Sequence, residues 1–233
     1  LASAQDITVG IKRVDGGVFS TWATTALQVG DALDVMPPDG RFTPKAAFTS
    51  TPDQPHAHRL GIAAGSGITP VLSIMAHTLA TEPASRFTLV YGNQRSNSIM
   101  FNEALQDLKD RYKERVSLIH VLSRQPQEVD LFYGRLDEAR LGKLLGQTVP
   151  MDLITEVFVC PEAMIENAER ALAQAGMARE RVHTERFAST HTSKKIAAPA
   201  TSVDSTGQIA YAFALEVVLD GKGHSFGMQA EDN

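Results

Sequence analysis

The chain has 233 residues, of which 43% are hydrophobic, and it carries a net charge of −5. This length suits one or two globular domains, and the acidic balance disfavours a nucleic-acid partner, which requires a basic face. No apolar run approaches the roughly 18 to 20 residues of a membrane-spanning helix. The first residues lack a basic region followed by an apolar stretch, and Cys160 is the single cysteine. We therefore expect a cytoplasmic protein with no internal disulfide and no membrane partner.

The middle of the chain alternates short apolar runs with longer amphipathic segments. Strands are expected at Leu60–Ala64, Phe87–Tyr91, Val116–Leu122, Glu156–Cys160 and Arg181–Phe187. Helices are expected at Pro70–Leu79, Ser98–Tyr112, Leu136–Leu145 and Pro161–Ala175. Strands that alternate with helices pair in parallel through right-handed crossovers. The sequence therefore predicts an α/β fold, with a five-stranded doubly wound parallel sheet in residues 59–187.

The segment before this region has a different pattern. Residues 1–47 are expected to be mostly β, with strands at Ile7–Arg13 and Asp31–Met36. Residues 48–58 are rich in proline and turn-forming residues, so they are predicted to be a connector.

The segment after the region also differs. Residues 188–206 are small, polar and proline-containing, which is typical of a flexible linker. In residues 207–233, the ranges Gln208–Leu219 and His224–Met228 are predicted to be the arms of a β-hairpin.

The stretch GIAAGSGITP lies between the first strand and the first helix of the α/β region. Gly65, Ser66 and Gly67 let the backbone turn tightly and approach a ligand, while a helix start offers N–H donors for phosphate. Thr69 is expected to cap that helix, and Pro70 suits its first position. The pattern favours a dinucleotide diphosphate loop, and a glycine-rich turn without a ligand is the alternative.

Polar residues follow the next two strands. One strand ends in Tyr91-Gly92-Asn93-Gln94-Arg95 and the other in Leu122-Ser123-Arg124. An NAD site usually has a carboxylate at the first of these positions, and none is present here. Arginine pairs well with phosphate, so Arg124 with Ser123, together with Asn93 and Arg95, is predicted to hold NADPH. The alternative is that both arginines are ordinary surface residues.

The motifs GSGITP, YGN, LSR, the Cys-Pro strand end and ERF, in this order, resemble the ferredoxin-NADP(+) reductase superfamily. The likeness is greatest to its branch of reductases from phenylacetyl-CoA epoxidase systems, and it covers nearly the whole chain. In that branch, an FAD-binding β-barrel precedes the nucleotide domain and a 2Fe-2S ferredoxin domain of β-grasp type follows it. The resemblance implies electron transfer from NADPH through FAD and the cluster to an oxygenase partner.

The resemblance also implies residue roles. Gly17, Ser20 and Thr21 would contact the flavin diphosphate, although a β-turn followed by a helix cap at Ser20 is an alternative. Thr69 and Cys160 would approach the nicotinamide, Ser123 and Arg124 the adenosine phosphate, and Glu185 with Phe187 the region between flavin and nicotinamide. Cys160 precedes a helix, a place that lowers a thiol pKa, so a nucleophilic role and a purely structural one stay open. No metal site is predicted.

The sequence departs from the family pattern in three respects, which limit what the resemblance implies. The 233 residues contain no Arg-x-Tyr-Ser flavin motif, no cysteines beyond Cys160 to ligate a cluster, and no glycine between Cys160 and Pro161. We therefore expect a chain shortened at both ends, with a partial FAD barrel, an intact NADP domain and the opening hairpin of a ferredoxin domain. The alternatives are a non-catalytic nucleotide-binding or docking module, and a flavin reductase that releases free reduced flavin.

Overall fold

The structure is a computed structural model that describes residues 6–35, 40–45, 51, 55–186, 213–219 and 222–228. The chain divides into two compact units, one comprising Gly40–Phe187 and the other Leu1–Asp39 with Ala188–Asn233. None of the described helices is long and apolar enough to cross a membrane. Phe187, the predicted linker 188–206 and much of the predicted connector 48–58 lie outside the described residues.

The larger unit contains a five-stranded parallel sheet in the order β4-β3-β2-β5-β6. Its strands are β2 (His58–Ala64), β3 (Arg86–Asn93), β4 (Val116–Leu122), β5 (Glu156–Cys160) and β6 (Val182–Thr184). Their long apolar runs are typical of parallel strands covered on both faces. The predicted doubly wound α/β fold is confirmed, although β6 ends sooner than expected.

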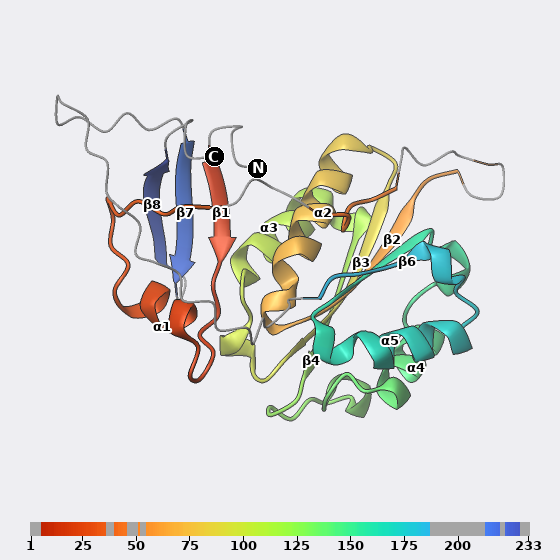
Figure 1. Cartoon of the computed structure of the whole chain (residues 1–233). Helices are drawn as coiled ribbons and strands as arrows, with labels where there is room; N and C mark the ends of the chain where they lie inside the picture. Colours follow the sequence, from red (N-terminus) through yellow and green to blue (C-terminus); the bar gives the residue numbers. More distant parts are fainter. Residues whose placement is uncertain are drawn as a thin grey trace. The chain divides into compact units, whose positions relative to one another are not determined.

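Four α-helices connect these strands: α2 (Ile68–Thr81), α3 (Asn102–Tyr112), α4 (Glu138–Gln147) and α5 (Glu162–Gln174). Figure 1 shows α2 and α3 on one side of the sheet and α4 and α5 on the other. Each side has its own apolar core. The first contains Val71, Met75, Phe87, Leu89, Leu105 and Phe158, and the second contains Leu60, Ile62, Val121, Leu141, Leu144 and Ile165. Right-handed crossovers between parallel strands produce this two-faced arrangement.

The start predicted for the second helix was wrong. The sequence predicted a helix from Ser98, but a 3-10 turn covers Ser96–Ser98 and α3 begins at Asn102. Phe101 adopts a left-handed conformation with φ of 57°, which interrupts the helical path between the two segments. The loop is anchored locally, because the Ser98 hydroxyl donates to the Arg95 carbonyl and accepts from the Arg95 N–H.

The smaller unit contains β1 (Asp6–Gly10), α1 (Val18–Thr25), β7 (Phe213–Leu219) and β8 (Lys222–Met228). β7 and β8 form the antiparallel hairpin that was predicted, and β1 pairs in parallel with β7.

Of the two strands expected in residues 1–47, the one at Ile7–Arg13 overlaps β1, but the rest of the described segment is not β. Val18–Thr25 is helical and Asp31–Val35 forms no strand. In α1, the hydroxyls of Thr24 and Thr25 donate to carbonyls one turn earlier at 2.7 Å, so both side chains find their partners within the helix. Asp31 accepts from the Gln28 N–H at 2.8 Å, and this local turn competes with a strand.

Candidate functional site

The carboxyl ends of the central strands meet at one edge of the sheet. Ala63 in β2 lies opposite Tyr91 in β3 on one side and opposite Cys160 in β5 on the other. The glycine loop directly follows β2, Asn93 ends β3, and Ser123 follows β4. In open parallel sheets, ligands bind outside the carboxyl ends of the strands. The topology therefore brings the predicted nucleotide residues of the larger unit to one edge.

The glycine loop is a 3-10 turn over Gly65–Gly67 that leads directly into α2. Gly65 has φ of +51°, a conformation that favours glycine. The predicted helix start was two residues late, because Gly67 is the N-cap and Ile68 the first residue of α2. Thr69 is therefore not the cap. Its hydroxyl donates to the Ser66 carbonyl at 3.1 Å, and Pro70 occupies the third helical position.

Pro70 still fits the first turn of α2. The first four N–H groups of a helix have no intrahelical partner, so the missing N–H costs no hydrogen bond at this position. The Ser66 carbonyl, four residues earlier, accepts from the Thr69 hydroxyl and from the Ile68 N–H.

Position 67 requires glycine because the backbone at the end of β5 lies directly against it. A Cβ atom added at Gly67 would lie 2.4 Å from the Cys160 carbonyl oxygen, 2.5 Å from its carbon and 2.6 Å from the Pro161 nitrogen. The glycine loop therefore packs directly on the peptide that ends β5. This contact joins the predicted diphosphate loop to the predicted nicotinamide residue.

Cys160 is fully buried, and burial raises the pKa of its thiol to about 12, with a smaller effect from the negative charge of Glu185. The expectation that the following helix lowers this pKa was wrong, because desolvation outweighs the helix dipole. A thiol with a raised pKa keeps its proton near neutral pH, which disfavours a nucleophilic role for Cys160. Glu185 is partly exposed just after β6, and its N–H donates to the Val159 carbonyl at 3.1 Å.

The loops after β3 and β4 are joined by backbone hydrogen bonds. The Ser123 N–H donates to the Asn93 carbonyl at 2.9 Å, and the Arg124 N–H donates to the Gln94 carbonyl at 2.8 Å. The side chains of Arg95 and Arg124 are exposed, and neither forms an ion pair with any residue that the structure describes. Within the described chain, two cations without an ion-pair partner therefore stand on neighbouring loops at the carboxyl edge of the sheet.

Asn93 adds an amide to this edge. Its side chain is 8% exposed, and its Nδ2 makes no hydrogen bond of good geometry within the described chain. It lies close enough to the Tyr91 phenol to oppose slightly the rise that burial causes in the tyrosine pKa. Because a buried N–H without a partner is costly, this donor suits an incoming acceptor.

Two tyrosines at the same edge were not among the predicted residues. The buried Tyr91 hydroxyl donates to the Gly65 carbonyl at 2.8 Å. Tyr133 is 41% exposed and is held beside Ser123, because it forms a parallel bridge with Leu122. An exposed aromatic beside the predicted adenosine residues offers a surface on which a base can stack. Tyr133 follows a polar loop and belongs to no helical or strand pattern in the sequence, so periodicity did not identify it.

The predicted flavin residues lie in the smaller unit, at the start of α1. Gly17 is the N-cap, and the Thr21 N–H donates to the Gly17 carbonyl at 3.1 Å. The Ser20 hydroxyl accepts from the Val14 N–H at 3.1 Å and keeps its own proton free to donate. The first-turn N–H groups of α1 and this hydroxyl suit a phosphate, so the residues fit part of a flavin diphosphate site.

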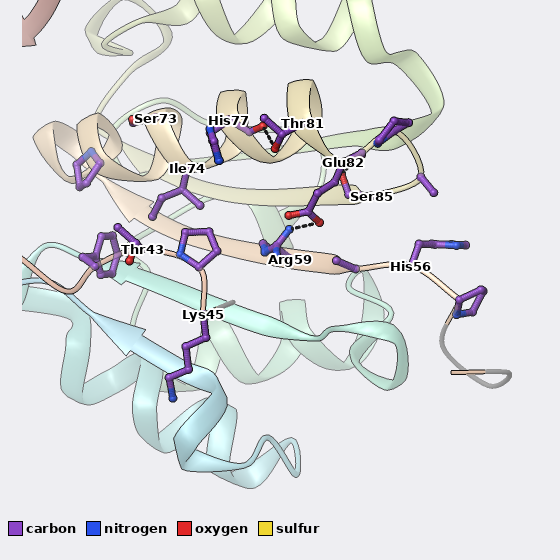
Figure 2. Close-up of a pocket in the computed structure, with 17 residues that line it drawn as sticks. Thr43, Lys45, His56, Arg59, Ser73, Ile74, His77, Thr81, Glu82 and Ser85 are labelled. Carbon is purple, nitrogen blue, oxygen red and sulfur yellow. Dashed lines mark hydrogen bonds and ion pairs between the residues drawn. The ribbon is translucent and has the colours of Figure 1, made fainter. Parts of the chain in front are cut away.

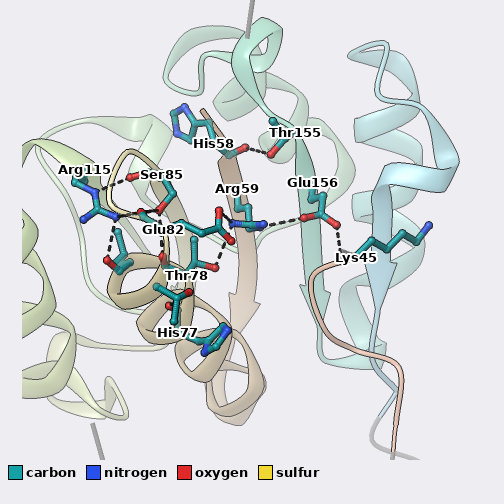
Figure 3. A network of polar contacts seen from close by, with 12 residues as sticks. Lys45, His58, Arg59, His77, Thr78, Glu82, Ser85, Arg115, Thr155 and Glu156 are labelled. Atoms are coloured by element: carbon teal, nitrogen blue, oxygen red, sulfur yellow. Dashed lines mark hydrogen bonds and ion pairs between the residues drawn. The ribbon is translucent and has the colours of Figure 1, made fainter. Parts of the chain in front are cut away.

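A groove of about 860 Å³ runs along α2 and includes only Pro70 from the predicted nucleotide set (Figure 2). Its floor is the buried Arg59 at the amino end of β2. The Arg59 guanidinium pairs with Glu82 at 2.8 Å and with Glu156 at 3.0 Å (Figure 3). Glu156 also accepts from the Lys45 N–H at 3.0 Å. Since Arg59 is already neutralised and lies far along β2 from the glycine loop, we assign the network to stability.

Comparison with known proteins identifies the larger unit. Residues 62–170 match the oxidoreductase NAD-binding domain family. The chain is 40% identical over 232 residues to one of the subunits of the Escherichia coli 1,2-phenylacetyl-CoA epoxidase, covering 97% of this chain and 60% of that protein. It is 33% identical over 220 residues to the ferredoxin reductase component of a Mycobacterium tuberculosis 3-ketosteroid-9-alpha-monooxygenase, covering 94% and 55%.

The solved structures agree on the fold. The flavohem-like FAD/NAD binding domain of Vibrio cholerae nitric oxide dioxygenase superposes with a TM-score of 0.56 at 22% identity, covering 73% of this chain and 65% of that one. The cytochrome P450 reductase of Amycolatopsis gives a TM-score of 0.56 at 20% identity, with coverage of 76% and 50%. The chain spans less than two thirds of the length of the curated relatives above. Residues 62–170 thus match an oxidoreductase NAD-binding domain, and the chain shares its fold with the two solved structures above.

Proposed function

We propose that this chain is the NADPH-binding part of a flavin-dependent reductase that delivers electrons to an oxygenase. The observation that carries the proposal is the position and exposure of Arg124. Its N–H is fixed on the Gln94 carbonyl, while its guanidinium is exposed and unpaired among the described residues, next to Ser123. A guanidinium and a hydroxyl on adjacent residues match the oxygens of the 2′-phosphate that distinguishes NADPH from NADH.

In this proposal the dinucleotide lies across the carboxyl edge of the sheet. Its diphosphate sits at the start of α2, where unpaired N–H groups and the helix dipole favour an anion. Its adenosine sits between Tyr133 and Arg124, and Asn93 donates its Nδ2 proton to the ligand. Its nicotinamide lies beside Thr69 and Cys160. FAD, when bound, supplies the acceptor of the hydride.

The chain's own contribution to hydride transfer is positioning. The reaction needs no protein nucleophile, but it needs donor and acceptor atoms held roughly 3 to 3.5 Å apart without intervening water. A neutral, buried Cys160 thiol places no charge beside the nicotinamide and excludes water from the end of β5. We also assign Glu185 to this reaction, together with Phe187, which lies outside the described residues.

The domain organisation belongs to the proposal as well. We assign residues 1–47 to the end of an FAD barrel, 48–58 to a connector, 59–187 to the NADP domain, 188–206 to a linker and 207–233 to the start of a 2Fe-2S domain. The 233 residues contain a single cysteine, which cannot ligate that cluster by itself, so we derive no electron-transfer step through it. The oxygenase partner is assigned to the phenylacetyl-CoA epoxidase system because the relative that carries this name is 40% identical.

The test is nucleotide binding by titration calorimetry. The wild-type chain should bind NADPH more tightly than NADH, and Arg124→Ala should weaken NADPH by about 10- to 100-fold, which corresponds to the loss of charge-assisted hydrogen bonds. NADH affinity should change little. Arg111→Ala, an exposed arginine on α3, is the matched control and should leave both affinities unchanged. Equal losses for both nucleotides in Arg124→Ala would refute the phosphate assignment.

Flavin spectra distinguish the reductase from a non-catalytic nucleotide-binding module. Reconstitution with FAD followed by NADPH should bleach the flavin absorbance. Bleaching of a flavin that then appears free in the filtrate would favour a reductase that releases reduced flavin. Nucleotide binding without bleaching would favour the docking module.

A further inference from the structure

Tyr91 supports the glycine loop from inside the protein. Its side chain is fully buried in β3, and its hydroxyl donates to the Gly65 carbonyl at 2.8 Å. Burial raises the pKa of the phenol far above neutrality, so the hydroxyl keeps its proton. The same carbonyl also accepts from the Ile68 N–H. Two donors from different elements therefore hold the Gly65 carbonyl in one orientation.

The orientation of this carbonyl determines where the next N–H points. In a trans peptide unit, the C=O and the N–H point in opposite directions. The Gly65 carbonyl faces Tyr91 in the core, so the Ser66 N–H of the same peptide unit faces away from the core. Gly65 can accept this arrangement because its φ of +51° is favourable for glycine.

The loop is held from a second side by β5. Gly67 packs against the peptide between Cys160 and Pro161, where no Cβ atom could fit. The Tyr91 hydroxyl also lies 3.5 Å from the Met100 carbonyl, so it links the glycine loop with the segment that precedes α3. Because the loop is held at both Gly65 and Gly67, the N–H of Ser66 between them points in one fixed direction.

We propose that Tyr91 is a positioning residue for the diphosphate of the bound dinucleotide. Its hydroxyl holds the Gly65 peptide so that the Ser66 N–H points at a phosphate oxygen. The inference rests on the proposed nucleotide function of this edge. It separates the diphosphate contact, which NADPH and NADH share, from the Arg124 contact, which only NADPH makes.

Tyr91→Phe tests the inference, because it removes the hydroxyl and keeps the ring. Binding of NADPH, NADH and adenosine 2′-monophosphate, which has no diphosphate, is measured by calorimetry on the full chain. We expect about 3- to 10-fold weaker binding of both dinucleotides, the loss that one hydrogen bond supports, and unchanged binding of the monophosphate. Tyr112→Phe, at the end of α3, is the matched control and should bind all three ligands normally.

An amide NMR measurement on the wild-type chain gives a second readout. The Ser66 amide should shift on addition of NADPH or NADH and stay in place on addition of the monophosphate. Unchanged dinucleotide affinity in Tyr91→Phe, an equal loss for all three ligands, or an unmoved Ser66 amide would overturn the inference. If the wild-type chain binds neither NADPH nor the monophosphate, the proposed function itself fails.

Discussion

Replacement of Gly67 by alanine tests how tightly the glycine loop packs on β5. The new Cβ would lie 2.4 Å from the Cys160 carbonyl oxygen, whereas ordinary contact begins at 3.4 Å. The loop or the end of β5 must therefore move by about 1 Å. The atoms it meets belong to the backbone, which cannot rotate away as a side chain can. Overpacking of this kind typically costs about 1 to 3 kcal/mol, and we expect the upper part of that range.

The displacement should also affect ligand binding, because Gly67 lies between the predicted diphosphate and nicotinamide contacts. We expect Gly67→Ala to lower the free energy of unfolding by about 2 to 3 kcal/mol. We also expect the substitution to weaken the binding of NADPH by at least about tenfold, because the loop that contacts the ligand would be displaced by about 1 Å. Urea denaturation with an unchanged m-value and titration calorimetry measure the two effects.

Gly146→Ala is the matched control for this substitution. Gly146 lies in α4 with open space around the position of a Cβ atom. Alanine there should stabilise the chain by about 0.5 to 1 kcal/mol through its higher helix propensity. If Gly67→Ala unfolds at the wild-type urea concentration and binds NADPH normally, the packing argument is wrong.

Two further predictions concern the amino end of the sheet. His58 is buried against Thr88, and desolvation lowers its pKa from 6.5 to about 4. The unfolded chain therefore binds a proton that the folded chain does not, so stability should fall as the pH drops from 6.5 towards 4, by about 2 to 3 kcal/mol at pH 4.5. Urea midpoints against pH measure this slope, and the same slope in His58→Gln would exclude His58 as its source. Arg59→Met leaves the carboxylates of Glu82 and Glu156 without their shared cation, which should cost about 3 to 5 kcal/mol. Arg170→Met breaks the surface ion pairs of Arg170 on α5 with Glu138 on α4 and with Glu166 on α5, and it should cost at most about 1 kcal/mol. Equal losses in the two variants would contradict the distinction.

The sequence alone predicted the architecture of the larger unit, because apolar runs and amphipathic periods are local signals. The expected strands at Val116–Leu122 and Glu156–Cys160 match the observed bounds, and the glycine loop lies where it was expected. Chain topology then places every strand's carboxyl end at one edge, so the sequence was enough to place Ser123 and Arg124 at the edge where the glycine loop lies. The β character expected for residues 1–47 failed at Val18–Thr25, which forms the helix α1.

Contacts between residues far apart in sequence were decided only by the tertiary structure. Gly67 is needed for its approach to the Cys160 peptide, and nothing near Gly67 in the sequence indicates that partner. The thiol pKa of Cys160 depends on how completely the surrounding strands and helices exclude water, and this burial reversed the direction expected from the neighbouring helix. The Tyr91 hydroxyl reaches Gly65 across 26 residues because β2 and β3 pair in register. Sequence patterns report which faces are apolar, whereas desolvation and close packing depend on the neighbours that the fold supplies.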